Sequence, residues 1–157
     1  MIQTLMMLLT VATISNNTAI ATTSCNTAVS VNTYMGYTEE EIDLMASIVY
    51  LEAGNQDMLG KQLVADVILN RVDSLDFPNT VHEVIYQKGQ FSTAKKAKSR
   101  ISYTPIDCYG AVISQITVRE NYDVIYFGRG FGCGEKLFKY GDHCFSGKKM
   151  KKVYIDV

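Results

Sequence analysis

The 157-residue sequence lacks an apolar segment long enough to cross a membrane as a helix. Its apolar run from Leu5 to Ile14 has only ten residues, against the roughly twenty that a spanning helix needs. Lys and Arg are absent from the first sixty residues, where six acidic residues occur. The remaining residues carry fifteen basic and ten acidic side chains, an excess too dilute to indicate a nucleic-acid partner. The composition, with 47% hydrophobic residues and a net charge of -1, excludes disorder and predicts one compact domain.

Motifs typical of cofactor-binding proteins are also missing. No C-x-x-C pair is present, and the glycine-rich segment "GRGFGCG" neither satisfies G-x-G-x-x-G nor precedes a predicted helix. A zinc site built from Cys133, His143 and Cys144 is disfavoured, because adjacent residues of a strand point to opposite faces. We therefore expect no nucleotide, no metal ion and no other cofactor.

The first twenty-one residues resemble a secretory signal peptide. The apolar run is followed by the polar "SNNT" and by Ala19-Ile20-Ala21, an A-x-A pattern typical of a cleavage site. No Lys or Arg precedes the run, so a short membrane anchor or a wrongly chosen start are the alternatives. We expect a signal peptide over 1–21, an uncharged linker over 22–36 and a secreted protein whose only membrane contact is through the signal.

All four cysteines lie beyond this cleavage point, at positions 25, 108, 133 and 144. An even number of cysteines in an exported chain permits two disulfides. Cys133 and Cys144 are closest in sequence, and they fall in a region that reads as strand, loop and strand. We therefore predict a disulfide between Cys133 and Cys144.

The segment "TEEEIDLMASIVYLEAG" predicts a helix that carries a single carboxylate, Glu52, at its end. Thr38 and Glu41 form a capping box at its start, and Gly54 ends it. Glu52 falls at the margin of an apolar face formed by Ile42, Met45, Ala46, Val49 and Ala53. A partly desolvated carboxyl group tends to keep its proton near neutral pH, as a general acid must. The alternative is a structural Glu52 paired with a basic residue such as Arg71.

Further helices are predicted from about Asp57 to Val72, after Thr80, and from Pro105 to about Glu120. Asn70, near the end of the second, either faces the Glu52 region or closes the helix. The loop Gly89-Gln90-Phe91-Ser92 is suited to sugar binding, because a ring can cover a pyranose face while amide and hydroxyl groups meet its hydroxyls. The alternative is an ordinary connecting loop that binds no ligand. Lys95 to Arg100 is read as a basic loop, and "DVIYFGRG" and "KLFKYGDHCFSG" as two strands.

These segments together resemble the spore-cortex-lytic, cell wall hydrolase family of bacteria and their phages. The resemblance rests on "IVYLEAGNQDMLGKQLVADVILNRVDSLDFPNTVHEVIYQKGQFS", followed by "YFGRG" and "KYGDHCFSG", and covers residues 37–147. It implies a mainly helical α+β domain like those of lysozymes and transglycosylases, with a small C-terminal antiparallel β element. A basic tail over 148–157 follows.

The resemblance also implies an activity on peptidoglycan. Glu52 matches the family's catalytic glutamate, which protonates the bond between N-acetylmuramic acid and N-acetylglucosamine and then activates the muramoyl 6-hydroxyl. Such a lytic transglycosylase needs no second carboxylate, unlike ordinary glycosidases. The alternatives are a muramidase that positions water with Asp57, Asp66 or Asp107, and a wall-binding module without activity. We expect a monomer that binds glycan strands in or near the cell wall, with substrate-binding residues that also match motif positions: Asn70, Gln90, Phe91, Ser92, Tyr126 and His143.

Overall fold

The computed structural model describes residues 33–148, which form a mainly helical α+β fold. The helices are α1 (Glu39–Ala53), α2 (Met58–Val72), α3 (Val81–Tyr86), α4 (Ala94–Arg100), the 3₁₀ turn η1 (Ile101–Tyr103) and α5 (Ile106–Thr117). The strands are β1 (Thr33–Tyr34), β2 (Tyr37–Thr38), β3 (Tyr126–Gly128), β4 (Glu135–Tyr140) and β5 (His143–Gly147). Within the described residues, the helices are all too short or too polar to traverse a bilayer.

Three helices begin where side chains cap them, as the sequence predicts. The Glu41 amide donates to the Thr38 hydroxyl at 3.2 Å, and the Thr38 amide donates to the Glu41 carboxylate at 2.9 Å, which completes the capping box of α1. Asp57 caps α2 and Thr80 caps α3 with one such bond each, because their side chains accept from the amides of Gly60 and Glu83. Each cap satisfies amide groups that have no partner inside the helix.

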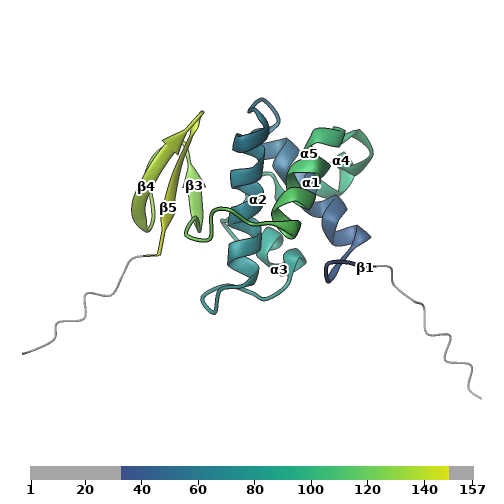
Figure 1. Cartoon of the computed structure of the whole chain (residues 1–157), viewed down its shortest axis with the longest axis horizontal. Coiled ribbons are helices and arrows are strands. Elements are labelled where there is room, and N and C mark those ends of the chain that lie inside the picture. Colours follow the sequence, from purple (N-terminus) through teal and green to yellow (C-terminus); the bar gives the residue numbers. More distant parts are fainter. Residues whose placement is uncertain (1–32, 149–157) are drawn as a thin grey trace, which may run out of the picture. The chain divides into compact units, whose positions relative to one another are not determined.

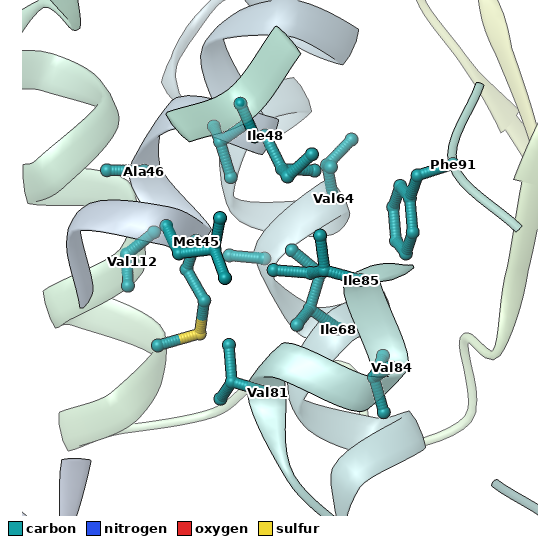
Figure 2. Close-up of a cluster of buried hydrophobic side chains, with 14 of the residues drawn as sticks. Met45, Ala46, Ile48, Val64, Ile68, Val81, Val84, Ile85, Phe91 and Val112 are labelled. Atoms are coloured by element: carbon teal, nitrogen blue, oxygen red, sulfur yellow. The ribbon is translucent and has the colours of Figure 1, made fainter. Parts of the chain in front are cut away.

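The helical core is built around α1 and α2. α1 packs against α2, α3, α4 and α5, so it is surrounded on most sides, as its nearly continuous apolar sequence predicts. Its Met45 and Ile48 interlock with Val64 and Ile68 of α2 (Figure 2), and all four side chains are fully buried. This core fixes the backbone at the end of α1, where Glu52 lies.

A three-stranded antiparallel sheet, in the order β3-β5-β4, packs against the other side of α2 (Figure 1). Leu63 and Val67 of α2 meet Val124 and Phe145 in a second apolar cluster. The predicted last strand is in fact the hairpin β4–β5, which turns at Gly141, where φ is +53°. The alternation pattern did not reveal this turn because Gly141 and Asp142 are flanked by residues that favour strands on both sides.

Three smaller predictions are also corrected. Lys95 to Arg100 is mostly the helix α4, not a loop, and α5 ends at Thr117 rather than near Glu120. The last residues of the predicted linker form β1, which pairs with β2 across a two-residue turn whose residues both have positive φ. The predicted signal peptide lies outside the described residues, as does the tail apart from its first residue.

The predicted Cys133–Cys144 disulfide is contradicted, because both residues are free thiols. Cys144 lies buried in β5, and its thiol contacts the Arg129 carbonyl at 3.9 Å, whereas Cys133 is exposed in the loop before β4. Cys108 is free as well and buried in α5. Cys25 lies outside the described residues.

Candidate active site

Glu52 occupies the last turn of α1, half-buried at the edge of the helical core. Its Oε1 accepts a hydrogen bond of 2.5 Å from the Thr93 hydroxyl. No residue in the described range 33–148 hydrogen-bonds to its other oxygen, Oε2. The fully buried neighbour Ala53 anchors this turn in the core. The carboxyl group is thus held from one side and left available on the other.

A cleft of about 850 Å³ opens over Glu52. Three segments that are distant in sequence form its walls: the end of α1, the residues from α3 into α4, and the ends of β3 and β5. Among residues 33–148, Glu52 is the only acidic side chain that lines it. Of the predicted substrate-binding residues, the cleft brings together Gln90, Phe91, Ser92 and His143.

His143 forms part of the cleft wall opposite the helices and is only 8% exposed. Its ring meets Phe127 edge-on, with 5.0 Å between ring centroids, and its Nδ1 has no hydrogen-bond partner among the described residues. Burial lowers the pKa of His143 below its ordinary value, while the charges of Glu52 and Asp142 oppose this shift. The imidazole is therefore neutral at neutral pH and can exchange a hydrogen bond with a bound ligand.

The Phe91 ring is not the sugar platform that the sequence suggests. Phe91 is 6% exposed, packs against Phe127 and lies over the Arg71 guanidinium, so its ring belongs mainly to the core. Tyr86 of α3, which sequence analysis missed, also lines the cleft and is 38% exposed. Tyr86 is therefore the better candidate for stacking on a sugar ring.

Asn70 and Tyr126 lie outside this cleft, contrary to the sequence-based prediction. The Asn70 amide donates to the carbonyls of Asn121 and Val124 at 2.7 and 2.8 Å, so it fastens the loop before β3 to α2. Tyr126 points to the opposite face of β3 from Phe127, near Phe77 and Arg71. The period-2 alternation of a strand explains why Phe127 lines the cleft and Tyr126 does not.

Arg71 forms no ion pair with Glu52 in the described part of the chain. The alternative in which Glu52 serves only as the structural partner of Arg71 is therefore not supported. The Arg71 Nε donates to the Ile125 carbonyl at 2.8 Å. Its guanidinium lies 5.1 Å from the Phe91 ring centroid and 5.2 Å from that of Phe77. Burial lowers the pKa of Arg71 to about 10, a value at which it still carries its charge near neutral pH.

The other acidic residues considered for catalysis are engaged elsewhere. Asp57 caps α2 and accepts a hydrogen bond of 2.6 Å from the Tyr140 hydroxyl. Asp107 pairs with Lys61 at 3.0 Å. Asp66 is fully buried in α2, where burial raises its pKa to about 6. None of them lines the Glu52 cleft.

The loop between α1 and α2 is tied to the β4–β5 turn beside His143. The side-chain amides of Asn55 and Gln56 both donate to the Asp142 carboxylate, at 3.3 and 3.2 Å. Gly141 allows this approach, because a Cβ there would lie 1.8 Å from the Gln56 side-chain oxygen. These contacts, which we call the turn latch, connect the helix that carries Glu52 to the strand that carries His143.

The fold and the sequence are similar to those of two bacterial catalytic domains of known structure. The catalytic domain of the germination-specific lytic transglycosylase SleB from Bacillus anthracis aligns with a TM-score of 0.62 and 31% identity, over 73% of this chain and 99% of that one. The catalytic domain of Bacillus cereus SleB aligns with a TM-score of 0.61 and 33% identity, over 71% of this chain and 92% of that one. These likenesses confirm the predicted α+β fold.

Among curated proteins, a spore cortex-lytic enzyme of Bacillus cereus is 46% identical over 70 residues, or 45% of this chain. The Bacillus subtilis enzyme of the same name is 40% identical over 65 residues, or 41% of this chain. The matched part spans only about a quarter of each relative, 26% and 21% of their lengths. The family model for cell wall hydrolases matches residues 55–146, which begin just after Glu52. The chain belongs to the cell wall hydrolase family.

Proposed function

We propose that this protein is an exported enzyme that cleaves peptidoglycan glycan strands as a lytic transglycosylase. The bond cut joins N-acetylmuramic acid to N-acetylglucosamine. The observation that carries the proposal is the cleft in which Glu52, held by Thr93, is the single acidic residue of the described part of the chain. The family, and the activity that the name of the SleB catalytic domain states, support it.

The chemistry needs one group that first gives and then takes a proton. Protonated Glu52 donates to the glycosidic oxygen, and the bond from this oxygen to the muramoyl anomeric carbon breaks. The resulting carboxylate takes the proton of the muramoyl 6-hydroxyl, whose oxygen bonds to the anomeric carbon and closes a 1,6-anhydro ring. No water is consumed, and Glu52 ends protonated as it began.

The remaining cleft residues bind and orient the strand in this proposal. Gln90 and Ser92 offer amide and hydroxyl groups to sugar hydroxyls, and Tyr86 offers a ring face. His143 is neutral and buried beside Glu52, so it can hold a sugar group without adding charge to the site. The Thr93 hydroxyl fixes the orientation of the carboxyl group.

A hydrolytic muramidase would require a second carboxylate about 5–10 Å from the first to act as a nucleophile or to activate water. No other carboxylate lines the cleft among residues 33–148, and Asp57, Asp66 and Asp107 are engaged elsewhere. The transglycosylase outcome is therefore favoured over hydrolysis. The predicted signal peptide supports a location of this activity outside the cytoplasmic membrane, at the cell wall.

Mass spectrometry of the products tests the proposal. Purified protein incubated with sacculi should release muropeptides with 1,6-anhydromuramoyl ends, whereas a hydrolase would give reducing ends one water heavier and a binding module no products. Glu52→Gln should lower the rate at least about a hundredfold while circular dichroism stays unchanged, because an amide oxygen can still accept from Thr93. A Glu52→Gln variant that still cuts would refute the assignment.

A further inference from the structure

Three cationic side chains converge on the Glu52 cleft from separate segments. Lys88 lies between α3 and α4, Lys95 in the first turn of α4, and Arg129 directly after β3. All three residues are exposed and line the cleft, and together we call them the cationic rim. Two segments that are distant in sequence, the stretch from α3 into α4 and the end of β3, thus deliver positive charge to one opening.

No residue of the cationic rim forms an ion pair within the described part of the protein. The ion pairs formed between residues 33 and 148 are Lys61–Asp107, Arg119–Asp73 and Lys148–Asp76, all outside this cleft. The positive charge of Arg129 also reaches the cleft floor, where it adds to burial in lowering the pKa of His143. Like charges that line a concave site attract anions to it.

The sugar rings of a peptidoglycan strand give these cations nothing to pair with. Their hydroxyl and acetamido groups are neutral, and the muramoyl lactyl group is neutral once a peptide is attached through an amide bond. The free carboxylates of the attached peptide stem are the anionic groups nearest the bond to be cut. Wall phosphodiesters are attached at the muramoyl 6-oxygen, which the proposed reaction needs as a free hydroxyl.

We propose that the cationic rim binds peptide-stem carboxylates, so that the enzyme prefers strands with free stem carboxylates to strands whose stem carboxylates are amidated. This inference rests on the proposed function and adds a substrate class to it. Exposed charges at the edge of a site mainly affect association, so the rim acts on KM and not on kcat.

The test compares two preparations of the same glycan strands: stems with free carboxylates and stems amidated chemically. At low salt the wild-type enzyme should cleave the first with a kcat/KM about tenfold above the second, since each exposed ion pair adds a small contribution. At about 0.5 M NaCl the preference should shrink, because salt screens exposed charges. Equal kcat/KM values on both would overturn the inference.

Charge-neutral variants assign the effect to the rim. In the triple variant Lys88→Gln, Lys95→Gln and Arg129→Gln, the ratio of kcat/KM between strands with free and with amidated stem carboxylates should fall to about one. The matched control neutralises three exposed lysines outside the cleft, Lys96, Lys98 and Lys139, and should keep the ratio of the wild type. A control that loses the preference equally would show a general charge effect and refute the rim.

A binding measurement separates this inference from the proposed activity. Glu52→Gln protein should sediment with stem-bearing sacculi about tenfold more tightly than with amidated sacculi at low salt, and adding the rim substitutions should abolish the difference. Retention that follows wall phosphate content and not stem carboxylates would contradict the inference. If the wild type cleaves no preparation, the proposed function fails, and the sedimentation result alone decides whether the rim binds stem carboxylates.

Discussion

Thr93 holds the N-cap position of α4, yet its hydroxyl does not cap the helix. It donates to Glu52 instead, at 2.5 Å, and α4 begins without a side-chain cap. A missing cap costs about 1 kcal/mol of stability, so this local cost is consistent with a role of Thr93 at the site. Sequence reasoning missed Thr93, although it directly follows the Gly-Gln-Phe-Ser loop that was singled out.

Thr93→Val should impair the enzyme without unfolding it. A hydrogen bond to an ionisable group contributes about 1.5–3 kcal/mol, so we expect kcat to fall about tenfold to a hundredfold with little change in KM. Thr93→Ser keeps the hydroxyl and should retain most of the activity. Steady-state assays of anhydromuropeptide release measure both, and a fully active Thr93→Val would show that the hydrogen bond does not serve catalysis.

Asp66 predicts a pH dependence of stability that is independent of the cleft. Burial raises its pKa from the ordinary 3.8 to about 6, and its Oδ1 lacks a hydrogen-bond partner in the described residues. Because the folded state binds this proton more tightly than the unfolded state, its contribution to stability is complete below about pH 3.8 and is lost as the pH rises through 6. Ionised Asp66 is then left buried, with a hydrogen bond from Asn121 as its compensation.

Between pH 5 and pH 8 this residue should lower the free energy of unfolding by about 1–1.5 kcal/mol. Asp66→Asn should remove that decrease, which urea unfolding at both pH values measures. His143, with its lowered pKa, changes stability in the opposite direction, so the difference between wild type and variant isolates Asp66. A variant whose stability changes with pH as the wild type's does would exclude this role.

At the scale of elements, local signals predicted the starts of α1, α2 and α3, because each depends on a cap within the next few residues. α4 carries no such signal, since its N-cap hydroxyl is used across the fold by Glu52. The positions of Asn70 and Tyr126 depend on where the loop before β3 runs and on which face of β3 meets α2. Both depend on contacts between residues that are distant in sequence, and the spacing of residues along the chain does not reveal such contacts.

For the site as well, local motifs were predictable from the sequence and long-range contacts were not. Glu52, Gln90, Ser92 and His143 reach one cleft, as predicted from their motifs. The turn latch went unrecognised, because its partners are separated by more than eighty residues. Its acceptor, Asp142, follows the strand turn that the sequence reading had also missed.

The turn latch gives a prediction about Gly141. Gly141→Ala should place a Cβ against Gln56 and force a side chain into positive φ, so we expect a loss of about 1–2 kcal/mol of stability. It should also lower kcat/KM, because the turn precedes His143. Gly132→Ala is the matched control, since its Cβ would meet nothing within 4 Å and its φ is not positive. Equal stability and activity of the two variants would show that the latch does not hold the cleft wall.

At the scale of the molecule, α2 joins the helical core to the sheet. One side of α2 packs on α1 and α5, and the other contributes Leu63 and Val67 to the cluster with Phe145 (Figure 1). The cleft is therefore assembled from both halves, with Glu52 from the helices and His143 from the sheet. Neither half alone contains the site.

A variant limited to residues 33–148 keeps the helical core, the three-stranded sheet and every residue that lines the cleft, so it should fold and cleave like the protein from Thr22 to Val157. A variant limited to the predicted boundaries 37–147 also loses β1 and the hydrogen bond of 3.0 Å between the Tyr34 and Thr117 hydroxyls. It keeps Thr38, so the α1 capping box survives, and we expect a loss of only about 1 kcal/mol. Urea unfolding and product assays of the three proteins measure this, and an unfolded or inactive 33–148 variant would show that the remaining segments complete the fold or the site.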